Sequence, residues 1–146
     1  MWAHNNRGLA YWRKAANDRA IADYTEALRL DPKYAVAYSN RGLAYSDKDE
    51  NDRAIADLNE AVRLDPKFAK AYNNRGLAYR DKGDTDRAIA NFTEAIRLDP
   101  KFANAFANRG LVYEKLADVS RARADYNATL GLSQNGTEWA RDKARQ

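Results

Sequence analysis

The chain has 146 residues, of which 45% are hydrophobic and 32% are charged, a balance typical of a folded globular protein and not of a disordered one. It has no cysteine, which excludes disulfides and thiolate chemistry, and its net charge of +4 is too small to indicate a nucleic-acid-binding domain. No apolar run approaches the roughly 20 residues of a membrane span, and the amino-terminal residues lack the apolar region of a signal peptide.

The first element expected is a pair of helices in residues 1–34, ended by a Leu-Asp-Pro triplet. Proline lacks an amide hydrogen and disfavours helical geometry in the residue before it, so the triplet stops a helix. The triplet recurs at an interval of 34 residues, with its proline at Pro32, Pro66 and Pro100. An Asn-Arg-Gly triplet keeps the same step, with its glycine at Gly8, Gly42, Gly76 and Gly110. This period predicts four repeats, at residues 1–34, 35–68, 69–102 and 103–136.

Each repeat has the pattern of two amphipathic helices that pack on each other. In the second repeat, for example, Ala54, Leu58 and Ala61 recur at three- and four-residue steps. A glycine on the first helix and alanines on the second allow the two helices to approach closely. The break between the helices is expected near residues 81–84 of the third repeat, where Gly83 suits the left-handed end of a helix.

The two ends depart from the repeat pattern. His4 stands where the later repeats have an aromatic residue, and Gln134 replaces the proline in the last repeat. Terminal repeats are expected to be atypical because one of their faces meets water. After the turn signal at residues 135–136, residues 137–146 are expected to form a short capping helix.

This pattern resembles the tetratricopeptide repeat (TPR) family, whose motif has an aromatic residue, a glycine, a tyrosine, two alanines, a large apolar residue and a proline at these offsets. The resemblance covers residues 1 to about 134. It implies an all-α fold, a right-handed α-solenoid of four antiparallel helix-turn-helix hairpins with a short C-terminal capping helix. It also implies one TPR domain over residues 1–146, in which the first helix of each hairpin lines a concave groove.

Residues that carry chemistry are scarce. The single histidine is assigned a structural role, and without a cysteine no His-containing triad or thiol nucleophile is easily assembled. The acidic run at residues 47–52 begins like a calcium loop. It has Asp52 at the sixth position, where such a loop needs glycine, and Leu58 at the twelfth, where it needs glutamate. No enzyme activity, no metal and no cofactor are therefore expected.

The expected groove has one constant side chain, an asparagine in the first helix of every repeat: Asn6, Asn40, Asn74 and Asn108. Asparagine is a poor helix former, and its amide can both donate to and accept from an extended peptide backbone. A column of four therefore favours a ladder that grips a peptide, and some TPR families are similar in this respect. The other interpretation is that these amides bond between neighbouring helices, or that they reflect recent duplication of the repeat.

Further groove positions are expected to determine specificity. Leu43 and Leu77 run beside the asparagine column, where they either offer an apolar strip to a partner or lie half-buried between adjacent first helices. Lys70, Arg80 and Trp12 occupy variable positions, and tryptophan is favoured at binding hot spots. The match to the TPR subclass that clamps a C-terminal carboxylate is poor, which argues against that kind of ligand.

A column of arginines follows the asparagines: Arg7, Arg41, Arg75 and Arg109. A structural role is expected for it, with the guanidinium groups reaching carboxylates on the second helices. The candidates are Asp23, Asp57 and Asp125, whereas the third repeat has Asn91 at this position.

These features predict a protein–protein interaction scaffold that binds an extended peptide or partner segment in the groove. The alternative is an architectural module that forms homo-oligomers by stacking through its terminal repeats. RNA binding is disfavoured because Asp47, Asp81 and Glu114 are mixed with the basic groove residues. The expected partner is thus a protein or peptide, with no nucleic acid and no membrane. The expected location is cytoplasmic, whether the chain stands alone or is a fragment of a longer repeat array.

Overall fold

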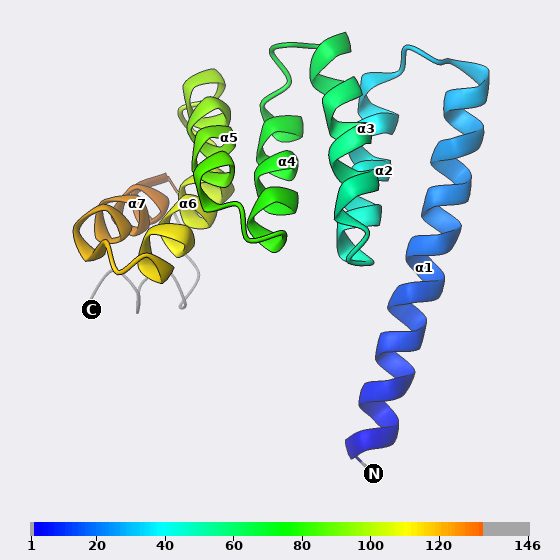
Figure 1. The fold of residues 1–146 in the computed structure, drawn as a ribbon, viewed down its shortest axis with the longest axis horizontal. Coiled ribbons are helices and arrows are strands. Elements are labelled where there is room, and N and C mark those ends of the chain that lie inside the picture. The colour runs from blue at the N-terminus through cyan, green and yellow to red at the C-terminus, as the bar shows by residue number, and fades with distance from the viewer. Residues whose placement is uncertain (1, 133–146) are drawn as a thin grey trace. The chain divides into compact units, whose positions relative to one another are not determined.

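The computed structural model describes residues 2–132 of the chain, with side chains from residue 13 onward, and this part contains seven α-helices and no strand (Figure 1). The helices are α1 (Trp2–Leu30), α2 (Ala35–Asp47), α3 (Asn51–Leu64), α4 (Ala69–Asp81), α5 (Thr85–Leu98), α6 (Ala103–Lys115) and α7 (Val119–Leu132). They fall into two compact units, Met1–Pro66 and Lys67–Gln146. The prediction of an all-helical fold is confirmed for the described residues, and the capping helix predicted for residues 137–146 lies outside them.

The Leu-Asp-Pro triplets end helices as predicted. Helices α1, α3 and α5 end at Leu30, Leu64 and Leu98, immediately before the aspartate of each triplet. The aspartate amide still donates to the carbonyl oxygen four residues earlier, at 2.9 Å in each case. The proline that follows has no amide hydrogen to continue the series, so the chain leaves the helix there.

Three helical hairpins are present in the described residues, α2–α3 in the first unit and α4–α5 and α6–α7 in the second. In each of them a glycine of the first helix faces a large apolar residue of the second. A Cβ atom on Gly76 would lie 2.6 Å from Cε1 of Phe92, a side chain that is fully buried. Because only a hydrogen atom fits at this point, the glycine permits the close packing of α4 on α5.

The turn inside each hairpin has one residue in the left-handed region of backbone conformation. This residue is Asp49 (φ 62°) before α3, Gly83 (φ 84°) before α5 and Ala117 (φ 60°) before α7. The next residue precedes the second helix, and its carboxylate caps that helix in two of the three turns. Asp84 accepts from the amide of Arg87 at 3.1 Å, and Asp118 accepts in the same way from Arg121.

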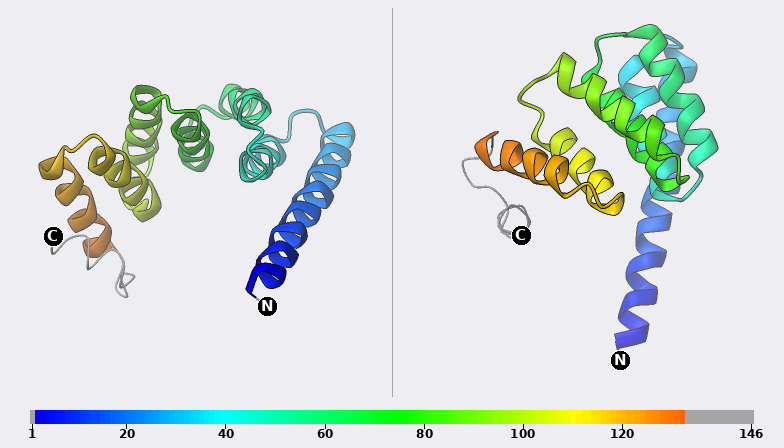
Figure 2. Two further views of the ribbon diagram at one scale, coloured as in Figure 1. Left: turned by 60° about the horizontal axis from the view of Figure 1, so that its bottom comes forward. Right: turned by 60° about the vertical axis from the view of Figure 1, so that its left-hand side comes forward.

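The first repeat differs from this arrangement and corrects the prediction of four hairpins. Helix α1 runs without interruption from Trp2 to Leu30, through residues 14–17 where the other repeats turn (Figures 1 and 2). Here the left-handed position is occupied by Ala15 and the capping position by Ala16. Alanine is the best helix former and has no side-chain oxygen to cap a new helix, so these residues extend the helix instead of ending it.

Candidate peptide-binding surface

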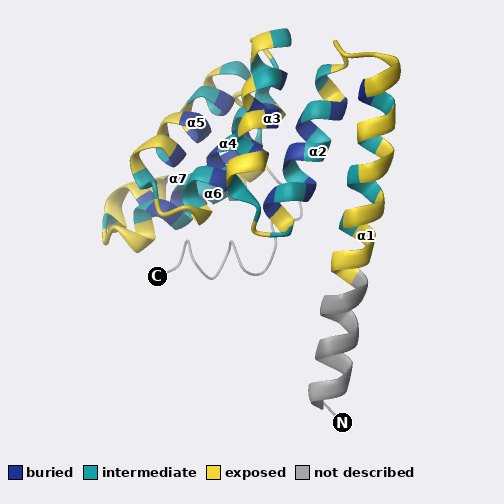
Figure 3. Cartoon of the chain, turned by 45° about the vertical axis from the view of Figure 1, so that its right-hand side comes forward, coloured by how far each residue is buried: buried dark blue, intermediate teal, exposed yellow. Residues whose placement is uncertain are grey.

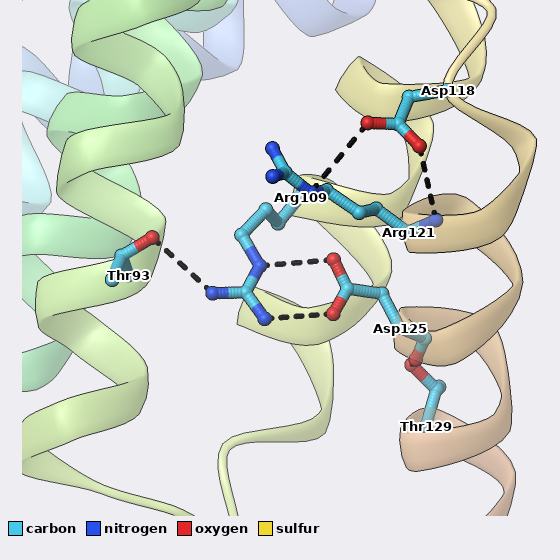
Figure 4. Close-up of polar contacts among 6 residues, drawn as sticks. All are labelled: Thr93, Arg109, Asp118, Arg121, Asp125 and Thr129. Atoms are coloured by element: carbon cyan, nitrogen blue, oxygen red, sulfur yellow. Dashed lines mark hydrogen bonds and ion pairs between the residues drawn. The ribbon is translucent and has the colours of Figure 1, made fainter.

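The arginine column ties the two helices of each hairpin together. Figure 4 shows Arg109 of α6 with two parallel hydrogen bonds to Asp125 of α7, at 2.9 and 2.7 Å, and a third bond to Thr93 of α5 at 3.2 Å. Asp125 is 4% exposed. These bonds to Asp125 raise the pKa of the Arg109 guanidinium above its ordinary value. The side chain is thus held on three helices of the second unit and is committed to the scaffold.

The same interaction recurs in the first unit. Arg41 of α2 forms two bonds of 2.7 Å with Asp57 of α3, and it also donates to Thr25 of α1 at 3.2 Å. Its guanidinium lies over the rings of Tyr38 and Tyr45, 5.7 and 5.9 Å from their centroids. The structural role predicted for this arginine is therefore confirmed.

The third repeat replaces the ion pair by a neutral contact. Arg75 donates to Oδ1 of Asn91 at 2.7 Å, and the amide nitrogen of Asn91 donates to the carbonyl oxygen of Arg87 at 2.8 Å. The asparagine therefore keeps the position of the carboxylate without its charge, as the sequence indicated.

The asparagine column lies partly inside the packed helices. Asn74 is only 3% exposed, and Asn40 and Asn108 are half-buried. In the second unit, Nδ2 of Asn108 on α6 donates to Oδ1 of Asn73 on α4 at 3.0 Å. This bond connects two first helices, which is the interhelical alternative considered for this column. The side chain of Asn6 lies outside the described residues.

The two leucines of the predicted apolar strip are half-buried. Leu77 packs at the edge of a cluster formed by Ala88, Phe92 and Val112 in the second unit. Leu43 has the same intermediate exposure in the first unit. Part of each side chain therefore belongs to the scaffold, and only the remainder is open to a partner.

A pocket in the second unit brings several groove positions together. It is lined by Arg80 and Asp81 of α4, Thr85 of α5, and Leu111, Val112 and Lys115 of α6. Arg80 forms an ion pair of 3.2 Å with Asp81, and both side chains are one-third exposed. Lys115 is exposed. The pocket thus has two cationic groups and one carboxylate above the apolar side chains of Leu111 and Val112.

The pocket includes one residue that sequence reasoning missed and omits two that it predicted. Thr85 belongs to the start of a second helix, and only the folded turn brings it beside α4 and α6. Lys70 is exposed at the opposite end of α4 and does not line the pocket. The side chain of Trp12 lies outside the described residues.

The first unit has a corresponding pocket at the C-terminal end of α2. Its lining residues are Arg13, Lys14, Asn17, Asp47, Lys48 and Asp49. The ammonium group of Lys48 contacts the carboxylate of Asp18 on α1, and this hydrogen bond raises the pKa of Lys48 above its ordinary value. This pocket has mixed charge but lacks the apolar floor of the pocket in the second unit.

Two further properties of the described residues bear on the site. No group of three or more histidine, aspartate or glutamate side chains is placed to hold a metal ion within this part of the chain. None of the described helices combines the length and the apolar character that crossing a bilayer requires.

Antiparallel helix pairs that recur every 34 residues, with first helices that share a surface, define a helical-repeat protein. The family model of the TPR repeat matches residues 16–49, 45–83 and 76–116, which is more than half of the chain. The chain therefore belongs to the TPR repeat family.

Several solved structures are similar to this chain. The crystal structure of MamA has a TM-score of 0.77 and 29% sequence identity, covering 90% of this chain and 76% of MamA. The first TPR of Spaghetti (RPAP3) bound to the HSP90 peptide SRMEEVD has a TM-score of 0.72 and 25% identity, covering 79% of this chain and 90% of that one. The second TPR domain of human RPAP3 in complex with the HSP70 peptide SGPTIEEVD has a TM-score of 0.69 and 27% identity, covering 76% and 92%. Among curated proteins, none matches this chain by sequence.

Proposed function

We propose that this protein is an interaction scaffold that holds an extended segment of a partner protein along the first helices of its repeats. In the second unit, an acidic side chain of that segment enters the pocket between α4 and α6. The observation that carries this proposal is the pairing of Arg80 and Lys115 above Leu111 in one pocket.

The charges of the pocket favour an anionic group. Arg80 and Lys115 outnumber the single carboxylate of Asp81, so the pocket has a net positive charge. The Arg80–Asp81 pair is partly exposed, and ion pairs of this kind contribute little to stability. Arg80 can therefore exchange Asp81 for a ligand carboxylate at small cost, and Lys115 adds a second attraction.

The apolar floor favours a ligand that combines acidic and aliphatic residues. Leu111 is half-buried, so a neighbouring aliphatic side chain of the partner would remove its remaining surface from water. The peptides in the two RPAP3 structures both contain the sequence Glu-Glu-Val-Asp, which has this combination. Their presence on similar scaffolds supports a ligand of this general chemistry.

The asparagines have a positioning role in this proposal. The burial of Asn74 and the bond from Asn108 to Asn73 support amides that fix the spacing of α4 and α6. Asn40 remains the asparagine whose amide we expect to reach a partner backbone, and Leu43 and Leu77 would contact it with their exposed parts.

The test is a binding titration of the full chain with fluorescent extended peptides of three kinds: acidic and aliphatic, basic and aliphatic, and neutral. We expect the acidic peptide to bind best and the variant Arg80→Ala/Lys115→Ala to bind it about tenfold more weakly, a loss of about 1.4 kcal/mol. The control Lys67→Ala/Lys101→Ala removes the same charge from two exposed lysines outside the pocket and should bind like the wild type. Equal weakening in both variants would reduce the effect to net charge and refute the pocket.

A second candidate function, self-assembly, is favoured by a different observation. One face of α1 is uncovered in a way that no other second helix of a described hairpin is.

A further inference from the structure

The C-terminal half of α1 has an incompletely buried face. In α3, α5 and α7 three positions on the face toward the first helix of the same hairpin are buried: Ala54, Leu58 and Ala61; Ala88, Phe92 and Ala95; Ala122, Tyr126 and Thr129. The corresponding residues of α1 are Ala20, Tyr24 and Ala27, and all three are only half-buried (Figure 3). The sequence thus provides an apolar stripe for packing, and the structure leaves it partly open.

Helix α2 covers a different side of α1. It contacts α1 through the pair of Lys48 with Asp18 and through the bond from Arg41 to Thr25, and Leu28 is buried on this side with 7% exposure. At 100° per residue, Ala20 and Ala27 lie on another side of the helix.

The open side carries a pocket and an exposed carboxylate. Residues 15, 16, 19, 20 and 23 line the pocket. Asp23 is exposed, whereas its equivalents Asp57 and Asp125 are buried against arginines of the first helices. The side that lacks a neighbour is therefore the side that a first helix covers in every other repeat.

The chain contains a copy of that first helix in residues 2–14. Arg7, Gly8 and Tyr11 stand there at the positions that Arg41, Gly42 and Tyr45 occupy in α2. The hydrogen bonds of Arg41 with Asp57 and of Arg109 with Asp125 join residues 16 apart in sequence. Arg7 and Asp23 have the same separation. Because α1 is continuous through Ala15 and Ala16, residues 2–14 extend away along the helix axis and cannot fold back on this side.

We propose that residues 2–14 of a second copy of this chain cover the open side of α1, in a reciprocal domain-swapped dimer. The two α1 helices lie antiparallel across a twofold axis at Ala15–Ala16. With the axis at this point, Arg7 of each copy faces Asp23 of the other, and each Gly8 faces the Tyr24 of its neighbour. Every contact of the swapped pair has a counterpart inside the hairpins α2–α3 and α6–α7, so the dimer needs no interaction that the sequence does not already use.

The residues at the crossing suit this arrangement. Ala15 and Ala16 favour a continuous helix, and their small side chains allow two helices to approach closely at the axis. The pairing is isologous, so it closes at two copies and does not continue into a filament. It differs in this respect from stacking through the ends of the repeat array, and it does not depend on the proposed peptide-binding pocket.

The first experiment measures the mass of the full chain by light scattering over a wide range of concentration. We expect a species of twice 16.5 kDa. The variant Ala15→Gly/Ala16→Asp gives the first repeat the turn residues of Gly83 and Asp84, and it should yield single chains with unchanged helix content, because the first hairpin then closes within one chain. A wild type of single chains at every concentration would overturn the proposal, as would a series of masses that grows without limit.

The second experiment separates swapping from any other dimer by reversing one charge in each of two variants. Arg7→Asp and Asp23→Arg each place like charges in contact in a swapped homodimer, and each should dimerise on the order of a hundredfold more weakly than the wild type. Mixing the two variants pairs opposite charges again at both contacts, so the mixture should regain the two-chain mass. A hairpin closed within one chain cannot be rescued by mixing. A dimer that persists in both variants and in Ala15→Gly/Ala16→Asp would use another surface and would overturn the proposal.

Discussion

The first and third repeats share the residues that pack their helices and differ at the turn. In the third repeat the chain turns at Gly83, which has φ 84°, and Asp84 caps α5. In the first repeat Ala15 and Ala16 stand at these two positions, and α1 continues. The periodic residues therefore specify which surfaces pack together, and the turn residues decide whether they pack within one chain.

The second and fourth repeats show how little turn chemistry is sufficient. Asp49 and Ala117 adopt the left-handed conformation without being glycine, at φ 62° and 60°. Asp118 then provides a cap for α7. An alanine at the left-handed position is thus tolerated where an aspartate follows it. The first repeat has neither a favourable residue at this position nor a capping oxygen, and this combination distinguishes it from the other three.

The largest expected effect comes from the packing that the repeats share. Gly76→Val would place side-chain atoms inside the ring of Phe92, which is fully buried and has no room to move. We expect the free energy of unfolding to fall by about 3 kcal/mol or more, as measured by urea unfolding followed by circular dichroism.

The matched control is the same substitution at Gly131 in α7, where a Cβ atom meets nothing within 4 Å. Gly131→Val should leave stability unchanged or raise it slightly, because valine is a better helix former than glycine. Equal losses in the two variants would show that the close approach of α4 and α5 is not the reason for the glycine.

Much of this architecture could be predicted from the sequence because its determinants are local and repeated. The prolines located the ends of α1, α3 and α5, and the sixteen-residue spacing of Arg41 and Asp57 indicated their ion pair. The continuous α1 was missed because the repeat period was extended over residues 14–17 without weighing the turn residues themselves. A reading of Ala16 as an absent helix cap would have found it.

The candidate site was less predictable because exposure depends on packing between helices. Asn40 and Asn74 have the same place in the repeat and the same neighbours in sequence, yet Asn74 is buried and Asn40 is half-buried. The position of Thr85 in the pocket depends on where α5 starts relative to α6, which no single helix pattern contains.

An intermediate effect is expected from removing a carboxylate from each kind of repeat. Asp57→Ala leaves Arg41 largely buried without its main partner, and we expect a loss of about 2 kcal/mol, less than for a fully buried pair because the Arg41 side chain is 18% exposed. Asp23→Ala removes an exposed carboxylate and should change stability by less than about 0.5 kcal/mol in the single chain.

Both variants should be compared by urea unfolding at a dilution where light scattering reports one chain. A large loss in Asp23→Ala under these conditions would mean that Arg7 already binds Asp23 within one chain, and that the first hairpin is closed. This outcome would remove the contrast between the first repeat and the others.

The smallest expected effects come from giving the third repeat the turn of the first. Gly83→Ala introduces a side chain at φ 84°, and Asp84→Ala removes the bond to the amide of Arg87, so each change should cost about 1 kcal/mol. We expect the hairpin α4–α5 to stay closed in the double variant, because Phe92 remains packed on Gly76 and Arg75 remains bonded to Asn91. Helix α5 is also covered by α6, which contributes Val112 to the same cluster, whereas α1 begins the array and has a neighbour on one side only. Light scattering of the double variant decides how much the turn contributes alone. A mass unchanged from that of the wild type would mean that an alanine turn opens a hairpin only at the end of the array. A doubled mass would mean that two residues are sufficient to redirect an interior repeat to another chain.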